Sequence, residues 1–185
     1  MRYVIIEHDP QGADALSLLQ EAAAEARALY PELHDPQALS PTNPPTPPRG
    51  AYFVAYAGMQ AVGMGAHRPL DQETSEVRRM YVLSSARRAG LARAVLDQIE
   101  AHARAQGFWR LVLETGNRQL PAMKLYEASG YQRVPPFGAY KDDPTSVCYE
   151  KFIAHALPGE ALSGKTCGST GCNKGVLRHQ SRQQA

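Results

Sequence analysis

The residues most clearly suited to chemistry lie where an expected strand ends and an expected helix begins. They form the run Arg87-Arg88-Ala89-Gly90-Leu91-Ala92-Arg93. A helix N-terminus presents unpaired backbone N–H groups and the positive end of the helix dipole, so it binds anions. Gly90 lets an anion approach the backbone closely, and the arginines can add charge-assisted hydrogen bonds. The run therefore predicts an anion site, with an ordinary junction and a solvated basic face as the alternative.

Three titratable residues before and after this run could move protons during a reaction. Glu76 lies on the preceding strand, where the alternative is a strand-edge carboxylate paired with Arg78 or Arg79. Glu114 interrupts an apolar strand, and a carboxylate there must be solvated, paired or functional. Tyr126 follows on a later helix, where the alternative is a core aromatic. These three residues are the candidates for acid–base chemistry.

The hydropathy pattern predicts the elements that must position these residues. Expected strands cover Tyr3–Glu7, Ala51–Ala57, about Ala61–Ala66, Ser75–Leu83, Leu111–Leu113, a short run from Tyr131, and Ser146–Ile153. Expected helices cover Gln11–Leu29, a stretch from near Gly90 to Gly107, and about Leu120–Ala128. The order is β-α-loop-βββ-α-β-α-ββ, which predicts one α/β domain over residues 1–153.

Two segments lack such a pattern. Seven prolines lie between Pro31 and Pro48, and they prevent a long helix or a central strand. We expect a surface loop there, and a loop of this length is usually functional or disordered. Residues 154–185 contain no aromatic residue and are dominated by Gly, Ser, Gln and Lys. Because that composition buries little apolar surface, we expect a disordered tail without a catalytic role.

The charge distribution argues against a nucleic-acid partner. The net charge is +2, but up to Ile153 there are 16 Lys and Arg against 17 Asp and Glu. A nucleic-acid binder concentrates positive charge on its folded domain, and here only one local arginine cluster (78, 79, 87, 88 and 93) qualifies. The sequence contains no run of about 18 apolar residues, so no membrane span is predicted. The N-terminus lacks a signal-peptide core. The expected location is the cytoplasm.

The three cysteines predict neither a disulfide framework nor a metal site. Cys148 lies in a strand-like run and is typical of a small buried hydrophobe. Cys167 and Cys172 have no second pair and no histidines at metal-site spacing. We therefore expect no metal.

Several blocks in order resemble the GNAT superfamily of acetyltransferases. Arg87-x-x-Gly90-x-Ala92 is similar to the family's Arg/Gln-x-x-Gly-x-Gly/Ala motif. The run LETGNRQLPAMKLYEASGY, residues 113–131, is similar to an LETG…LYE…GY segment of a bacterial subgroup. Phe137-Gly138-x-Tyr140 and the stretch at 146–151 also resemble that subgroup. The short motif alone is weak evidence, whereas the ordered set of blocks is strong. Before about Ala51 the resemblance is thin.

This resemblance implies a fold and a co-substrate. The fold is a mixed, mostly antiparallel sheet with helices on both faces and a central parallel strand pair that splays apart. The pantetheine arm of acetyl-CoA would lie in the gap between Arg78–Val82 and Leu111–Thr115, pairing with backbone groups as a pseudo-strand. Asn117 would bind the pantetheine or cap a helix. The implied cofactor-binding residues are Met80, Tyr81, Val82, Arg87, Arg88, Ala89, Gly90, Leu91, Ala92, Arg93, Asn117 and Tyr126.

The resemblance also implies catalytic roles. A lysine-like amine has a pKa of about 10.4, so the acceptor must lose a proton before it reacts. Glu76 lies eleven positions before Arg87, the spacing at which some related histone acetyltransferases place their catalytic glutamate. Glu76 is therefore the first candidate for the general base and Glu114 the second. Tyr126 would be the general acid at the thioester sulfur, and a backbone N–H near Tyr81 would meet the oxyanion.

We therefore expect an acetyl-CoA-dependent N-acetyltransferase that acetylates a primary amine of a small-molecule or amino-acid-like acceptor. No cysteine lies in these motifs, which favours direct transfer in a ternary complex over an acyl-cysteine route. The alternative is a non-catalytic acetyl-CoA-binding domain that acts as a sensor or structural partner. The identity of the acceptor and the existence of a homodimer stay open.

Overall fold

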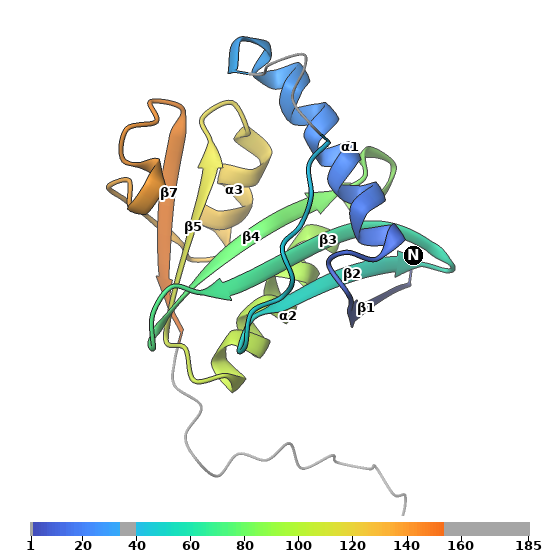
Figure 1. Ribbon diagram of the computed structural model, residues 1–185, viewed down its shortest axis with the longest axis horizontal. Helices are drawn as coiled ribbons and strands as arrows, with labels where there is room; N and C mark the ends of the chain where they lie inside the picture. The colour runs from blue at the N-terminus through green and yellow to red at the C-terminus, as the bar shows by residue number, and fades with distance from the viewer. Residues whose placement is uncertain (1, 34–39, 154–185) are drawn as a thin grey trace, which may run out of the picture.

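The computed structural model describes residues 2–33 and 40–153 (Figure 1). Its strands form one mixed sheet in the order β1-β2-β3-β4-β5-β7-β6. The strands are β1 Tyr3–Glu7, β2 Ala51–Ala57, β3 Gln60–Pro69, β4 Thr74–Val82, β5 Arg110–Gly116, β6 Gln132–Val134 and β7 Ser146–Phe152. The expectation of a disordered tail at 154–185, and the part of the Pro-rich loop at 34–39, lie outside the described residues.

Helices cover both faces of the sheet, as expected. Helix α1 (Ala13–Leu29) lies on one face, and α2 (Leu91–Ala105) and α3 (Leu120–Ala128) lie on the other (Figure 1). Short 3₁₀ turns lie at Pro31–Leu33, Ser84–Ala86 and Gly138–Tyr140. None of the helices in the described ranges is long and apolar enough to cross a membrane.

Strand β2 shows why the sequence folds into three layers. Its residues are apolar and buried from Ala51 to Ala55, so both of its faces are covered. Phe53 belongs to the apolar cluster beneath α2, whereas Val54 belongs to the smaller cluster beneath α1. Because successive strand residues point to opposite faces, one strand contributes to both cores.

The element order and types match the sequence expectations, with a few shifted boundaries. Strand β3 extends to Pro69, whereas the sequence predicted an end at Ala66 or slightly beyond. Strand β5 begins at Arg110 and ends at Gly116, so it is longer than the apolar Leu111–Leu113 core that marked it in the sequence. The polar ends of β5 are held by pairing with β7 over its full length, which hydropathy alone does not record.

The described part of the Pro-rich segment, residues 40–50, runs beside α1 across the face of the sheet (Figure 1). It is fixed there by Asn43, which is 4% exposed. The Asn43 amide donates to the Pro10 carbonyl at 2.9 Å, and its Oδ1 accepts from Arg79 Nε at 2.9 Å. Proline cannot supply ladder hydrogen bonds, so a side-chain amide joins this segment to the sheet instead.

A chain of buried polar side chains links β3, β4 and α2. The Ser75 hydroxyl donates to the Arg68 carbonyl, so its oxygen accepts from His67 Nδ1, each at 2.8 Å. His67 Nε2 then lacks a proton and accepts from His102 Nδ1 at 2.7 Å. Burial, together with the neighbouring His102, lowers the pKa of His67 to about 4.

This lowered pKa predicts a loss of stability in mild acid. Below pH 6.5 the unfolded chain protonates His67, but the folded chain does not do so until about pH 4. The contribution of neutral His67 is therefore present above pH 6.5 and falls by about 3 kcal/mol as the pH falls to about 4. Urea unfolding across this window should show a shallower pH dependence for His67→Gln than for the unmodified chain. Equal slopes for the two proteins would contradict the prediction.

Candidate active site

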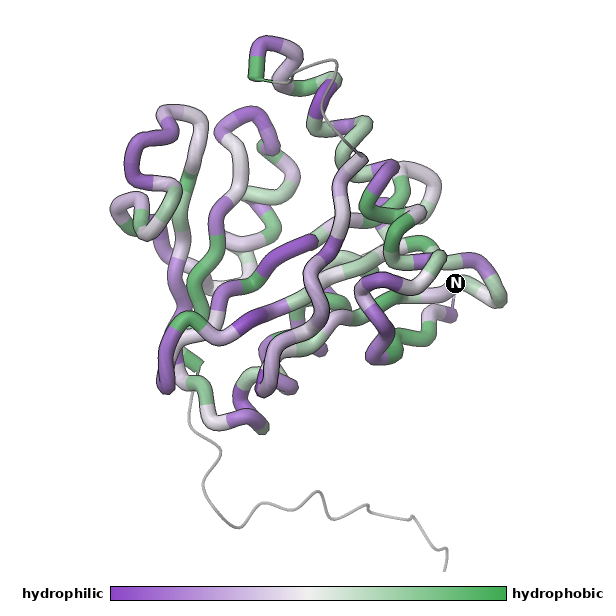
Figure 2. The backbone as a smooth tube through the Cα atoms, viewed as in Figure 1, coloured by the Kyte–Doolittle hydropathy of each residue, from purple (hydrophilic) through white to green (hydrophobic). Residues whose placement is uncertain are grey.

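The site begins where β4 and β5 stop pairing. Their parallel ladder joins residues 74–77 to residues 110–113 and ends at the pair Val77 and Leu113, although β4 continues to Val82 and β5 to Gly116. Along β5 the residue type changes at the same point, from hydrophobic to hydrophilic (Figure 2). The splayed pair is therefore confirmed. The expected gap was wrong in one respect, because residues 111–113 are paired and the gap on β5 begins at Glu114.

A β-bulge in β4 determines which side chains face this gap. Ala66 of β3 pairs with Arg78 and Met64 pairs with Tyr81, so two β4 residues oppose the single Gly65. The bulge residue Arg79 has a φ of 58°. A bulge of this kind interrupts the alternation of side chains along a strand. Consequently Arg78 and Arg79 line the same pocket although they are neighbours in sequence.

Gly65 is required at this position because there is no room for a side chain. A Cβ atom at Gly65 would lie 2.6 Å from Val95 Cγ1 and 2.8 Å from Met80 Sδ. Val95 lies in the core of α2, so the helix packs directly against the bulged strand. The sequence reasoning did not identify this glycine.

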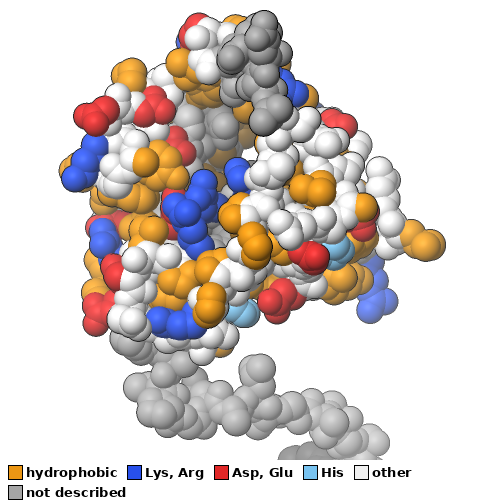
Figure 3. Space-filling model, viewed as in Figure 1, with side chains coloured by type: hydrophobic (Ala, Val, Ile, Leu, Met, Phe, Trp, Pro, Cys, Tyr) orange, Lys and Arg blue, Asp and Glu red, His pale blue; other side chains and the backbone are white. Residues whose placement is uncertain are grey.

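A pocket of about 350 Å³ opens at the splayed strands, a volume typical of small-molecule sites. In Figure 3, Lys and Arg side chains gather at the centre of this face, at the hollow between the β5–β7 side and the α1 side. The lining includes all three acid–base candidates. The lining residues are Tyr30, Leu33, Glu76, Val77, Arg78, Arg79, Met80, Glu114, Thr115, Gly116, Gln119, Tyr126, Tyr140 and Thr145.

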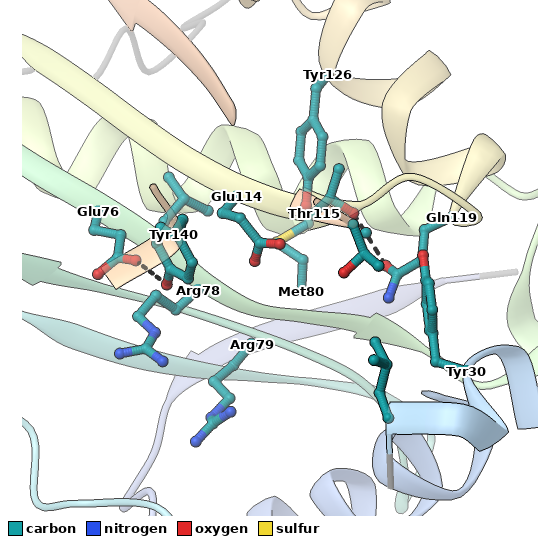
Figure 4. A pocket seen from close by; sticks show the side chains of 14 residues that line it. Tyr30, Glu76, Arg78, Arg79, Met80, Glu114, Thr115, Gln119, Tyr126 and Tyr140 are labelled. Atoms are coloured by element: carbon teal, nitrogen blue, oxygen red, sulfur yellow. Dashed lines mark hydrogen bonds between the residues drawn. The ribbon is translucent and has the colours of Figure 1, made fainter. Parts of the chain in front are cut away.

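Tyr126 reaches the pocket from the opposite layer. It extends from α3 between the splayed strands (Figure 4) and is 4% exposed. Its ring packs in the core with Tyr131 and Tyr149, so the core-aromatic alternative describes the ring, while the residue also lines the pocket. Burial, with the nearby charge of Glu114, raises the pKa of Tyr126. The hydroxyl therefore stays protonated at neutral pH, as a proton donor must.

Glu114 lies on β5 at the point where the gap opens. Its Oε1 accepts a hydrogen bond from the Ser146 hydroxyl at 2.8 Å, and no ion pair to it occurs among the described residues. Burial raises the pKa of Glu114, and the charge of Arg78 only partly offsets that effect. A carboxylate with a raised pKa is a stronger base than an ordinary glutamate.

Glu76 is 1% exposed and both of its oxygens are engaged. Oε2 lies 2.7 Å from Arg68 Nε, and Oε1 accepts from the Tyr140 hydroxyl at 2.6 Å (Figure 4). The alternative interpretation of Glu76 as a paired carboxylate is correct in kind, but its partner is Arg68 and not Arg78 or Arg79. Arg68 lies directly opposite Glu76 in the β3–β4 register, and antiparallel partners are closer than neighbours along one strand.

The expected anion-binding turn has the geometry that its sequence predicts. Gly90 is the N-cap of α2 in the left-handed region, with φ at 78° and no side-chain cap. A Cβ built on Gly90 meets no atom within 4 Å, so the backbone is open on that side. Ala89 and Arg88 before it are exposed. The first N–H groups of a helix have no intrahelical partner, so this open turn could hold an anion.

The arginines around this turn differ in their contacts. Arg87 forms an ion pair with Glu25 of α1 at 2.6 Å and donates from Nε to the Val82 carbonyl at 2.8 Å. Arg93 pairs with Asp97 at 2.7 Å. For Arg88, with φ at 61°, no hydrogen bond or ion pair occurs among the described residues. Arg88 is therefore the most available of the three for an incoming anion.

The remaining expected cofactor residues lie along the same path. Met80, Tyr81 and Val82 follow the bulge on β4, and Leu91 and Ala92 open α2. Asn117 follows β5, where its Oδ1 accepts from the Tyr30 hydroxyl at 3.4 Å. The suggestion that Asn117 caps a helix was wrong, because α3 begins after Gln119.

Sequence reasoning missed Glu25 in α1 and Tyr30, the residue that follows the helix. Glu25 binds both Arg87 and the Tyr81 hydroxyl, the latter at 2.8 Å. Tyr30 accepts from the Arg118 N–H at 2.7 Å and lines the pocket. The two residues of each contact are separated by 56 to 88 positions in the sequence. No local pattern in the sequence indicates such contacts.

Comparisons with known proteins identify the family to which the chain belongs. Residues 15–131 match the model of the acetyltransferase (GNAT) family. The chain is 35% identical over 153 residues to IAA acetyltransferase of Azospirillum brasilense, covering 80% of this chain and 95% of that protein. A crystal structure of a presumed acyl-CoA N-acyltransferase from Klebsiella pneumoniae is 31% identical, with a TM-score of 0.67, covering 82% of this chain and 98% of that one.

A GNAT family acetyltransferase from Elizabethkingia anophelis, solved with acetyl-CoA bound, shares the fold at 17% identity and a TM-score of 0.59. The match covers 82% of this chain and 98% of that structure's chain. The family match spans more than half of this chain, and it includes the splayed strands and the helix start at Gly90. The chain therefore belongs to the GNAT family and is an N-acetyltransferase that depends on acetyl-CoA.

Proposed function

We propose that this enzyme transfers the acetyl group directly to a primary amine of a small-molecule or amino-acid-like acceptor in a ternary complex. The observation that carries the proposal is that Glu114 and Tyr126 line one pocket at the splayed strands. One is a carboxylate with a raised pKa and the other a protonated hydroxyl. The similarity to IAA acetyltransferase supports a small-molecule acceptor.

The residues present fit acetyl-CoA. The uncapped helix start at Gly90 and the guanidinium of Arg88 suit a diphosphate. Beyond Val77, β4 has no β5 partner, and its free edge suits amide groups of the pantetheine arm. The Val82 carbonyl already accepts from Arg87, so the neighbouring backbone groups around Met80 would make these contacts. When bound, acetyl-CoA supplies an acetyl group activated as a thioester.

The protein's own residues then handle the protons. Glu114, directly or through a water, would take a proton from the ammonium form of the acceptor. Tyr126 would donate to the departing sulfur, and a backbone N–H near Tyr81 would donate to the carbonyl oxygen as its charge develops. Glu76 was the first candidate for the base, but its two engaged oxygens suit a residue that holds Arg68 and Tyr140 in place.

Replacing Gly90 by glutamate should abolish acetyl-CoA binding measured by calorimetry. The new side chain would place bulk and negative charge at the proposed diphosphate position, which is now open. Gly90→Ala is the matched control, because it carries the same strain of roughly 1–2 kcal/mol from a left-handed φ but no charge. The control should bind within a few-fold of the unmodified enzyme. Unaltered affinity in the glutamate variant would overturn this placement.

Tyr126→Phe should lower kcat at least about tenfold and leave the affinity for acetyl-CoA nearly unchanged. The ring packing with Tyr131 and Tyr149 is kept, so the variant removes only the hydroxyl. Thiol release from acetyl-CoA across a panel of amines measures the turnover. An unchanged kcat would remove Tyr126 from the mechanism.

The two carboxylates can be separated by isosteric variants. Glu114→Gln should lower kcat by about 100-fold or more, the usual effect of losing a general base. Glu76→Gln should chiefly lower the midpoint of thermal unfolding, because it weakens the contacts to Arg68 and Tyr140. In the unmodified enzyme, kcat/KM should rise with pH through a pKa above the ordinary glutamate value, since burial raises the pKa of Glu114. A larger loss of kcat in Glu76→Gln than in Glu114→Gln would instead indicate that Glu76 is the base.

A further inference from the structure

The pocket contains more positive charge than it needs for its own structure. Arg68 and Glu76 neutralise each other at 2.7 Å. That leaves Arg78 and Arg79 beside the single carboxylate of Glu114. The described residues form no ion pair with either arginine. Positive charge that gathers in a hollow and forms no ion pair favours an anionic ligand.

The Arg79 side chain donates its hydrogen bonds to neutral acceptors. Its Nε donates to Asn43 Oδ1 at 2.9 Å and an Nη to the Thr42 carbonyl at 3.4 Å. Burial and the like charge of Arg78 lower its pKa. The bulge thus holds two guanidinium groups on one face, and neither forms an ion pair with a described carboxylate.

Arg78 is the group left available. Within the described ranges its side chain makes no hydrogen bond or ion pair, and it lies in the pocket between Glu76 and Glu114 (Figure 4). A guanidinium presents a planar fork of donors that matches a carboxylate with two parallel hydrogen bonds. The pocket therefore offers a fixed donor site beside the acid–base pair.

We propose that the acceptor is an amine that also carries a carboxylate, which Arg78 binds while Arg79 adds positive charge. This inference rests on the proposed acetyl transfer and narrows its acceptor to amino acids and similar amino-carboxylic acids. The amine of such a compound would point toward Glu114. Arg78 and Glu114 line the same pocket of about 350 Å³, so one small molecule can reach both the anion site and the proposed base.

The experiment compares matched acceptors that differ only at the carboxylate. Suitable sets are leucine, leucinamide and 3-methylbutylamine, and phenylalanine, phenylalaninamide and phenethylamine. The ammonium group of an amide is more acidic than that of the parent amino acid, so this comparison favours the neutral compound and works against the proposal. Initial rates of thiol release give kcat and KM for each acceptor.

The unmodified enzyme should prefer the acid over its amide by at least about 10-fold in kcat/KM, the worth of a hydrogen bond to a charged group. Arg78→Met should remove this preference by raising KM for the acid about 10-fold or more. Any effect of the lost charge on Glu114 is shared by acids and neutral amines, so the decisive quantity is the ratio of kcat/KM for an acid to kcat/KM for its amide, which should fall about 10-fold or more. Arg78→Lys, which keeps the charge without the fork, should recover part of the preference.

Arg27→Met is the matched control. Arg27 is exposed on α1 and does not line the pocket, so this variant removes the same charge elsewhere. It should keep the full preference for acids, which separates recognition at Arg78 from the net charge of the protein. Thermal unfolding of each variant checks that it is folded.

The outcomes separate this inference from the proposed function. Turnover of neutral amines that equals or exceeds that of acids, with no change in Arg78→Met, would overturn the carboxylate site and leave acetyl transfer intact. The same holds if 2-aminoethyl phosphate outcompetes every carboxylate, which would assign Arg78 to a phosphate. No thiol release with any amine, together with no binding of acetyl-CoA, would instead overturn the proposed function.

Discussion

The parting of β4 from β5 is the constraint on which the rest of the structure depends. Their ladder ends at Val77 and Leu113, and unpaired backbone edges of this kind must find other partners. The bulge opposite Gly65 turns β4 away and carries Arg78 and Arg79 together onto one face. The same stretch of β4 therefore carries both an edge without a β5 partner and two neighbouring guanidinium groups.

The same gap gives two similar carboxylates different surroundings. Glu76 lies where the strands are still paired, and it is neutralised by Arg68 and held by Tyr140. Glu114 lies one step beyond the last pair, where burial raises its pKa and no ion pair offsets it among the described residues. Tyr126 reaches the same space from the opposite layer. Environment, more than residue type, thus distinguishes a supporting carboxylate from a proposed base.

Helix α1 and the residue that follows it contact two separate parts of the proposed site. Glu25 binds Arg87 and Tyr81, next to the proposed pantetheine path. At the end of the same helix, Tyr30 contacts Asn117 and lines the pocket. One helix therefore supports both the start of α2 and the far end of the pocket.

The sequence by itself determined the element order and the start of α2 at Gly90, and it named the acid–base candidates, because these follow from local periodicity, capping and residue type. It could not rank Glu76 against Glu114, since their partners Arg68, Tyr140 and Ser146 are brought near by strand register and loop packing. Nor could it place Arg78 and Arg79 on one face, because simple alternation predicts opposite faces. Only the tertiary structure decided these points, through pairings between residues distant in the chain.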